Sequence, residues 1–209
     1  MVLNEELERL KNRVYITMSA RFEAYRRMKR RKISSTVSLA LLSLSIIGYN
    51  ILQLCTGFEK YNEVITAVTI MLSVFVLALS LLVSYLNYSE KEHKYYECGL
   101  KLSTLYDKIT LHATPSTPLE VVEKFFNEYD HILGECGVNH INIDNLRARV
   151  RIKKEEYDRC DRVWIWLYWH LFDVNTLYWV LAFGIPWLTG IIIFCPINSG
   201  NPICQCGCQ

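Results

Sequence analysis

Hydroxyl and amide side chains repeat along one face of the apolar stretch at residues 64–89. With successive residues about 100° apart on a helix, the polar members fall within about 60° of arc: Thr66, Thr69, Ser73, Ser80, Ser84 and Asn87. Val76 and Leu77 continue the same stripe. In one interpretation the small hydroxyl side chains let a neighbouring helix pack closely. In the other, the stripe lines an aqueous path in an oligomer, with Val76 and Leu77 as an apolar constriction.

The side chains that most often carry catalysis form no recognisable motif. The five histidines, at positions 93, 112, 131, 140 and 170, are widely spaced and have no metal-ligand pattern. The sequence contains no P-loop and no G-x-G-x-x-G, H-E-x-x-H or G-x-S-x-G arrangement. It therefore predicts a protein that is not an enzyme and that uses no cofactor.

The polar stripe belongs to the second of two uncharged stretches, 33–58 and 64–89, each 26 residues long. At about 1.5 Å rise per residue each would form a helix of about 39 Å, longer than the ~30 Å hydrocarbon core of a bilayer. Residues 59–63 leave room only for an antiparallel turn. The sequence predicts a transmembrane hairpin over 33–89. Its helices contain no Asp, Glu, His, Lys or Arg, which argues against a proton-coupled transporter or a voltage sensor.

The first stretch has polar side chains on two nearly opposite sides. Ser34, Ser38 and Ser45 lie on one side, and Thr36, Ser43 and Asn50 lie on the other. Such a helix could contact neighbours on both sides, as an inner helix of an oligomer would. The alternative is that these side chains bond to carbonyls one turn earlier in their own helix.

Positive charge is concentrated before the first stretch. Residues 1–32 carry ten Lys or Arg against four Asp or Glu, the 59–63 turn carries one Lys, and twelve Lys or Arg follow the hairpin. Because basic residues beside a span favour the cytoplasmic side, both ends of the hairpin are predicted to lie in the cytoplasm. The basic cluster next to the first span is predicted to meet anionic headgroups at the membrane interface, at about 1 kcal/mol per residue. It consists of Arg26, Arg27, Lys29, Arg30, Arg31 and Lys32.

Helical periodicity also marks the flanking regions, and the predicted fold class is all-α. Apolar residues recur every three or four positions at 3, 7, 10, 14, 18 and 22, so residues 1–32 are predicted to form an amphipathic helix that packs on the later helices. In the cytoplasmic helical region 90–162, the second hairpin helix is predicted to continue without a break to near Pro115. Thr117 and Glu120 are predicted to form a capping box for the next helix.

That next helix is predicted to end at Gly134. Asp144 is predicted to cap a further helix, which is highly charged from Arg147 to Arg162.

The last part of the chain is aromatic and then apolar. All five tryptophans lie between Trp164 and Trp187, so 163–173 is predicted to be an interfacial aromatic segment. Residues 174–196 are predicted to form a third membrane helix kinked at Pro186; a re-entrant or surface-lying tail is the alternative.

Cysteines raise two separate expectations. Cys98, Cys136 and Cys160 lie in the part predicted to be cytoplasmic, where thiols stay reduced, and are predicted to be free, buried, small apolar residues. In the tail 197–209, Cys204, Cys206 and Cys208 lack the paired spacing of a structural zinc site. The sequence leaves four interpretations of these three cysteines: metal capture, thiol chemistry, disulfides between subunits, or a tail that merely tolerates cysteine.

Several short motifs resemble those of one known family. The helix before the hairpin carries Arg13, Thr17, Ala20-Arg21, Ala24 and Arg27-Met28. Later segments carry Tyr95-Tyr96-Glu97-Cys98-Gly99, Leu105-Tyr106, Tyr129, Ile132-Leu133, Asn139-His140 and Asp144. Over roughly residues 7–149 the chain resembles the SLATT family, small bacterial membrane proteins associated with SMODS- and SLOG-type nucleotide signalling. The later segments look like the subfamily found beside reverse transcriptases, which usually has Arg-Ala where this chain has Glu97-Cys98.

The resemblance implies an effector in a bacterial antiviral, abortive-infection type system that oligomerises and permeabilises the inner membrane when triggered. It implies a nearby-encoded reverse transcriptase or nucleotide-signalling protein as a partner, and no direct nucleic-acid binding is expected. A membrane-anchored scaffold or sensor that recruits cytosolic partners without conducting ions is the alternative function.

Overall fold

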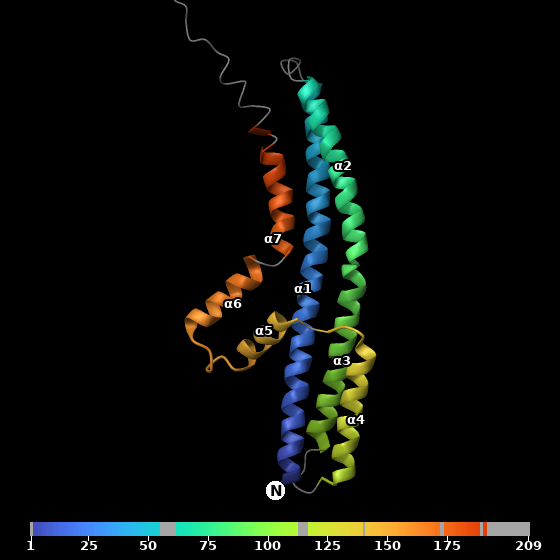
Figure 1. Ribbon diagram of the computed structural model, residues 1–209, viewed down its shortest axis with the longest axis vertical. Coiled ribbons are helices and arrows are strands. Elements are labelled where there is room, and N and C mark those ends of the chain that lie inside the picture. The colour runs from blue at the N-terminus through green and yellow to red at the C-terminus, as the bar shows by residue number, and fades with distance from the viewer. Residues whose placement is uncertain are drawn as a thin grey trace, which may run out of the picture. The chain divides into compact units, whose positions relative to one another are not determined.

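The computed structural model describes residues 2–54, 62–112, 117–139, 141–171, 174–188 and 190–191. Every regular element in these residues is helical, which confirms the predicted all-α class (Figure 1). The elements are α1 (Val2–Gln53), α2 (Asn62–Leu86), α3 (Tyr88–His112), α4 (Leu119–Cys136), α5 (Asn142–Ile152), α6 (Arg159–Leu171), α7 (Val174–Trp179) and the π-helix η2 (Val180–Gly184).

The chain forms two compact units, and α1 contributes residues to both. The first, here called the helical unit, comprises Met1–Lys32 and Asn87–Asp173. The second, the apolar unit, comprises Ile33–Leu86 and Val174–Gln209.

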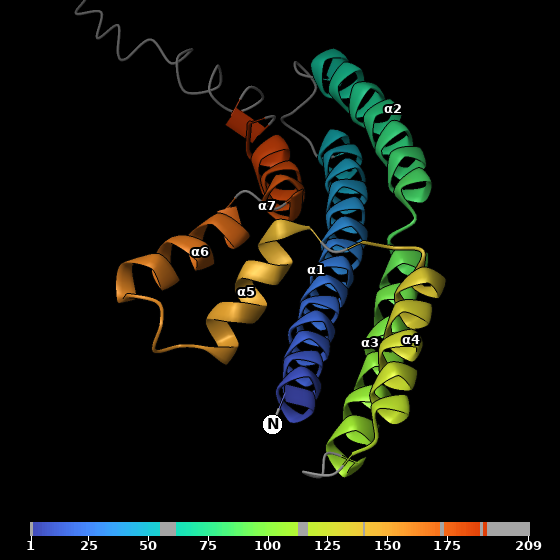
Figure 2. The ribbon, with the colours of Figure 1, turned by 60° about the horizontal axis from the view of Figure 1, so that its bottom comes forward.

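The core of the helical unit joins the first half of α1 to α3 and α4, and α3 and α4 lie side by side in both views (Figures 1 and 2). Leu7, Leu10 and Val14 of α1 are almost fully buried against residues such as Leu105 and Phe125. Burial of a Leu or Val side chain stabilises a fold by about 1.5–3 kcal/mol. The predicted amphipathic packing of residues 1–32 is therefore confirmed.

The helix leaving α2 is broken, so the prediction of an uninterrupted helix to Pro115 is wrong. Asn87 has a φ of 46°, in the left-handed region, and separates α2 from α3. Asparagine tolerates this conformation better than most residues. Its side-chain amide donates to the Glu90 carboxylate.

Both predicted limits of α4 also need correction. Pro118, and not Thr117, is the N-cap of α4, so Glu120 is not three residues after the cap and no capping box forms. The Thr117 hydroxyl donates to the His112 carbonyl at 2.8 Å. Gly134 lies inside α4. The helix ends at Cys136, because Gly137 adopts a φ of 57° that suits glycine at a helix C-terminus.

The single charged helix predicted from Asp144 to Arg162 is two helices. Asp144 lies in the first turn of α5 rather than before it, and its Oδ2 accepts from the Ile141 N–H at 3.2 Å. α5 ends at Ile152, and α6 begins only at Arg159.

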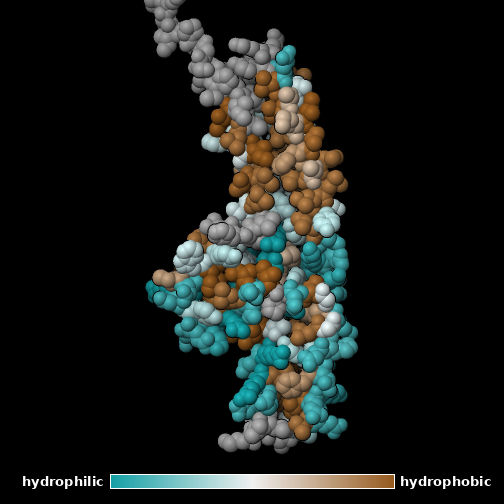
Figure 3. Space-filling view, in the orientation of Figure 1, coloured by the Kyte–Doolittle hydropathy of each residue, from teal (hydrophilic) through white to brown (hydrophobic). Residues whose placement is uncertain are grey.

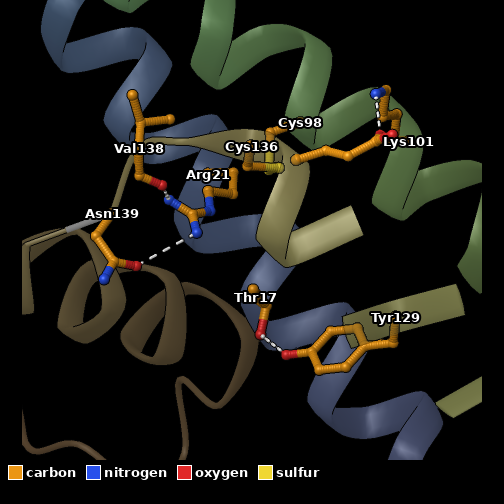
Figure 4. The surroundings of a disulfide bond; sticks show 9 residues. Thr17, Arg21, Cys98, Lys101, Tyr129, Cys136, Val138 and Asn139 are labelled. Atoms are coloured by element: carbon orange, nitrogen blue, oxygen red, sulfur yellow. Dashed lines mark hydrogen bonds and ion pairs between the residues drawn. A yellow bond between two sulfur atoms is a disulfide. The ribbon is translucent and has the colours of Figure 1, made fainter. Parts of the chain in front are cut away.

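Cys98 and Cys136 form a disulfide between α3 and α4, with Cα atoms 5.6 Å apart (Figure 4). The prediction that they are free thiols is wrong, because it considered only the redox compartment and not the two residues that the packing of α3 on α4 brings together. Cys160 is free as predicted, but it is exposed rather than buried.

The apolar unit contains the predicted hairpin. Both long helices contain segments long and apolar enough to cross a membrane, and the surface over α2 is predominantly apolar (Figure 3). Ile65 and Leu72 of α2 pack with Tyr49 of α1. At the end of the hairpin, the Gln53 amide donates to the Asn62 carbonyl at 3.0 Å and to the Thr66 hydroxyl at 2.7 Å.

The C-terminal apolar helix, Thr176–Leu188, packs on α1 through hydrogen bonds as well as apolar contacts. Ser38 donates to the Tyr178 carbonyl at 2.8 Å, and Tyr49 donates to the Pro186 carbonyl at 2.6 Å. These bonds bracket η2, where the π-turn and the proline disturb the regular helical ladder. Polar backbone groups freed inside an apolar environment need such partners. The shorter apolar helix covers Thr176–Leu188, and residues 174–175 and 190–191 of the predicted third span are helical as well. Residues 189 and 192–196 of that span lie outside the described residues.

Removing the disulfide should destabilise the helical unit. We expect Cys98→Ala with Cys136→Ala to lower the free energy of unfolding by about 2–5 kcal/mol, since the bond closes a separation of 38 residues. Thermal melting of the detergent-solubilised chain, followed by circular dichroism, measures this effect. Cys160→Ala is the control and should leave the midpoint unchanged; an unchanged midpoint in the double variant would contradict the pairing.

Candidate functional site

The polar stripe of α2 is largely exposed on the single chain. Thr66, Ser73, Ser80 and Ser84 are exposed. Asn87 is exposed too, but it lies in the break after α2 and does not continue that helix. Leu77 is 64% exposed, and Val76 is half-buried. Thr69, at 5%, is the only buried member.

The hairpin packs through another face of α2. At about 100° per residue, Ile65 and Leu72 lie about 80° around the helix from the centre of the stripe. Thr69 and Val76 lie between the two faces, which explains their partial burial. Close packing of α2 on α1 therefore does not use the stripe as a whole.

The hydroxyl groups nearest the turn are satisfied within their own helix. Thr66 donates to the Asn62 carbonyl at 2.7 Å, Thr69 to Thr66 at 3.0 Å and Ser73 to Thr69 at 2.7 Å. Such bonds make a polar face tolerable beside lipid while leaving each oxygen able to accept a further bond.

The polar residues of the first span divide between the two interpretations: some bond to their own helix, and others contact a neighbouring helix. Ser43, Ser45 and Asn50 donate to carbonyls four residues earlier, at 2.9, 2.8 and 3.0 Å. Ser34 and Ser38 are buried, and Ser38 bonds to the C-terminal helix.

Arg27 of the basic cluster lies in the interior of the helical unit. Its Nε and Nη2 donate to the two carboxylate oxygens of Asp144 at 2.9 and 2.8 Å, and both side chains are nearly inaccessible. A two-point pair of this kind orders both side chains. The sequence suggested a cap at Asp144, but Asp144 also ties α5 to α1.

Other members of the cluster have protein partners too. Arg26 pairs with Glu23 at 2.6 Å, Arg30 stacks on the Trp169 ring at 3.1 Å, and Lys32 pairs with Glu92 at 3.0 Å. Lys29 and Lys32 are exposed. Headgroup contact therefore stays a prediction, and it applies to the exposed members rather than to Arg27.

A second buried carboxylate, which sequence reasoning missed, is Glu23. It is 2% exposed and pairs with Arg147 at 3.0 Å and Arg151 at 3.2 Å, both from α5. Arg147 also lies 3.2 Å from the centre of the Trp169 ring, on which Arg30 stacks as well. The only sequence signal was one acidic residue between the basic residues Arg21 and Arg26 of α1.

Burial lowers the pKa of two arginines in this unit. For Arg147 the neighbouring Glu23 carboxylate acts in the opposite direction. For Arg21, Tyr95, Tyr129 and Asp144 oppose the effect of burial. Arginine remains protonated in proteins, so both groups keep their positive charge at neutral pH.

Residues that carry the family resemblance contact one another. The hydroxyl groups of Thr17 and Tyr129 share a hydrogen bond of 3.0 Å, and Arg21 donates to the Val138 carbonyl and to the Asn139 side chain (Figure 4). The Tyr95 hydroxyl donates to the Asn139 carbonyl at 2.8 Å. These contacts join α1 to α3, α4 and the segment before α5.

One glycine in these motifs has a packing role. A Cβ atom on Gly99 would lie 2.9 Å from the Phe22 ring, so glycine allows α3 and α1 to approach closely at this level. No group of three His, Cys, Asp or Glu residues suited to a metal occurs among the described residues. Cys204, Cys206 and Cys208 lie outside them.

Comparison with known protein families identifies a membrane effector class. The model of SMODS and SLOG-associating 2TM effector domain family 5 matches residues 3–196, and the chain belongs to this family. No curated protein and no solved structure matches the chain. Domains of this family associate with SMODS and SLOG signalling genes of conflict systems, and the match indicates no enzymatic family.

Breaking the Arg27–Asp144 pair should destabilise the helical unit strongly. Arg27→Ala leaves a buried carboxylate uncompensated, a change that costs about 3–5 kcal/mol, whereas exposed Lys29→Ala should change stability little. Thermal melting followed by circular dichroism compares the two. Equal midpoints for both variants would show that the pair does not hold α5 on α1.

Proposed function

We propose that the chain is an oligomeric, pore-forming effector of a bacterial antiviral defence system, which permeabilises the inner membrane when triggered. The observation that carries this proposal is the exposed stripe of α2 beside a hairpin interface that uses another face. Exposed hydroxyl groups on an apolar helix gain little from lipid, and they gain hydrogen bonds from another subunit or from water.

Assembly is a physical requirement of this proposal. Two helices do not enclose a water-filled path, so several chains must bring their α2 stripes together. Thr66, Thr69, Ser73, Ser80, Ser84 and Asn87 would then face the path, and Val76 and Leu77 would form the apolar constriction.

The proposed topology follows from the charge distribution. The N-terminus and both ends of the hairpin lie in the cytoplasm, residues 163–173 lie at the interface and 174–196 cross the membrane as a third helix. A ligand or partner, such as a nucleotide-signalling protein or a reverse transcriptase encoded nearby, would open the pore by binding the open arrangement more tightly than the closed one.

A scaffold or sensor is the second candidate function. Trp164 and Trp166 of α6 are 66% and 56% exposed, and exposed tryptophans are typical of binding surfaces as well as of membrane interfaces. In this alternative the helical unit recruits a cytosolic partner and the hairpin serves only as an anchor.

Filling the stripe should abolish conduction. We expect Ser73→Leu with Ser80→Leu to stop dye release from vesicles containing the purified chain, because both substitutions make the path bulkier and more apolar. The matched control is Ala67→Leu with Ala78→Leu: both alanines are exposed, and they lie about 130–150° around α2 from the stripe centre.

Membrane insertion and oligomer size must be equal in both variants. Equal release by the stripe variant and the control would remove α2 from the pore lining. No release by the wild-type chain even when its signalling partner is added would favour the scaffold.

A further inference from the structure

A cavity of about 550 Å³ lies within the helical unit, between α1, α4, α5 and the segment that precedes α5. Its volume falls in the range of about 300–1,000 Å³ typical of small-molecule sites. Four arginines line it, namely Arg9, Arg13, Arg21 and Arg149, and no acidic side chain does. We call it the arginine cavity.

Most of this positive charge is not compensated by the protein. Arg9 pairs with Glu5 and Glu6, both outside the cavity lining. Among the described residues, the other three cavity arginines form no ion pair with a carboxylate. Arg13 stacks on the Tyr129 ring at 5.2 Å, and Arg149 donates to the Asn145 side chain at 3.1 Å.

Arg21 is the most unusual of the four. It is 2% exposed, donates only to the neutral groups of Val138 and Asn139, and its buried Nε has no hydrogen-bond partner in the described part of the chain (Figure 4). The cost of burying an arginine is normally offset by a carboxylate, as Arg27 illustrates in this same unit. An anion in the arginine cavity would supply the missing negative charge.

The shape of the lining limits what that anion is. Arg9, Arg13 and Arg21 lie within about 120° of arc on α1 and extend over about 18 Å of helix. A single phosphate is too small to meet them all. Between them lie neutral hydrogen-bonding and aromatic groups, including Asn12, Asn145 and Tyr129, which suit the uncharged part of an elongated ligand.

We propose that the arginine cavity binds a nucleotide-type ligand that carries at least two phosphate groups. Guanidinium groups bind phosphate oxygens in two-point geometry, and asparagine amides both donate to and accept from base edges. Binding at this site does not depend on conduction by the hairpin.

A lipid headgroup is the other source of phosphate. Of the lining residues on α1, Arg21 comes nearest in sequence to the apolar stretch that starts at Ile33, and it precedes that stretch by 12 residues, or about 18 Å of helix. This separation favours a soluble ligand.

Calorimetric titration of the full chain in phosphatidylcholine nanodiscs tests the proposal, with ATP and inorganic pyrophosphate as probes. We expect saturable binding, and we expect Arg13→Gln with Arg149→Gln to weaken it at least about tenfold, because charge-assisted bonds to phosphate are lost. Both positions are exposed, so the variant should keep its helix content by circular dichroism. Arg159→Gln, an exposed site outside the cavity lining, should bind as the wild type does.

Four results would overturn the proposal. Absence of saturable binding by both probes would exclude phosphate recognition, and equal binding by the double variant would exclude this cavity. Loss of ATP binding in nanodiscs that contain phosphatidylglycerol, or tighter binding of single-stranded DNA than of ATP, would assign the arginines to lipid or to nucleic acid instead.

Discussion

The buried ion pair between Arg27 and Asp144 determines how the helical unit is assembled. It joins α1 to the first turn of α5, where the Asp144 carboxylate also accepts from the Ile141 N–H. The position of α5 then brings Arg147 to Glu23 and to the Trp169 ring, and Arg149 to the arginine cavity. Breaking such a buried pair is far more costly than losing an exposed one, because the remaining charge has neither water nor a partner.

The apolar unit obeys a different constraint, since its polar groups must be satisfied without help from charged side chains. Several of its hydroxyl groups, such as Ser73, bond to carbonyls of their own helix, and Ser38 and Tyr49 bond to carbonyls of the C-terminal apolar helix. The face of α2 that packs in the hairpin is apolar apart from Thr69. The polar stripe is thereby left on the surface of the single chain, which is the basis for proposing that other subunits or water meet it.

Patterns that depend on periodicity were predictable from the sequence, and pairings between distant residues were not. Hydropathy and spacing identified the hairpin and the buried face formed by Leu7, Leu10 and Val14, because each arises within one helix. The disulfide and the Glu23 cluster depend on which helices pack together, and a single sequence contains no direct record of that packing. The break at Asn87 was missed because hydropathy is insensitive to a single residue in the left-handed region.

The most direct test of the central claim is the accessibility of the α2 stripe during conduction. In planar bilayers containing the Ser80→Cys variant, a charged, thiol-reactive methanethiosulfonate reagent should reduce the current, because the introduced thiol faces the aqueous path. Ala78→Cys lies on another exposed side of the same helix, and it should respond no more than the unsubstituted chain. Current that is reduced equally in both variants, or in neither, would contradict a path lined by this stripe.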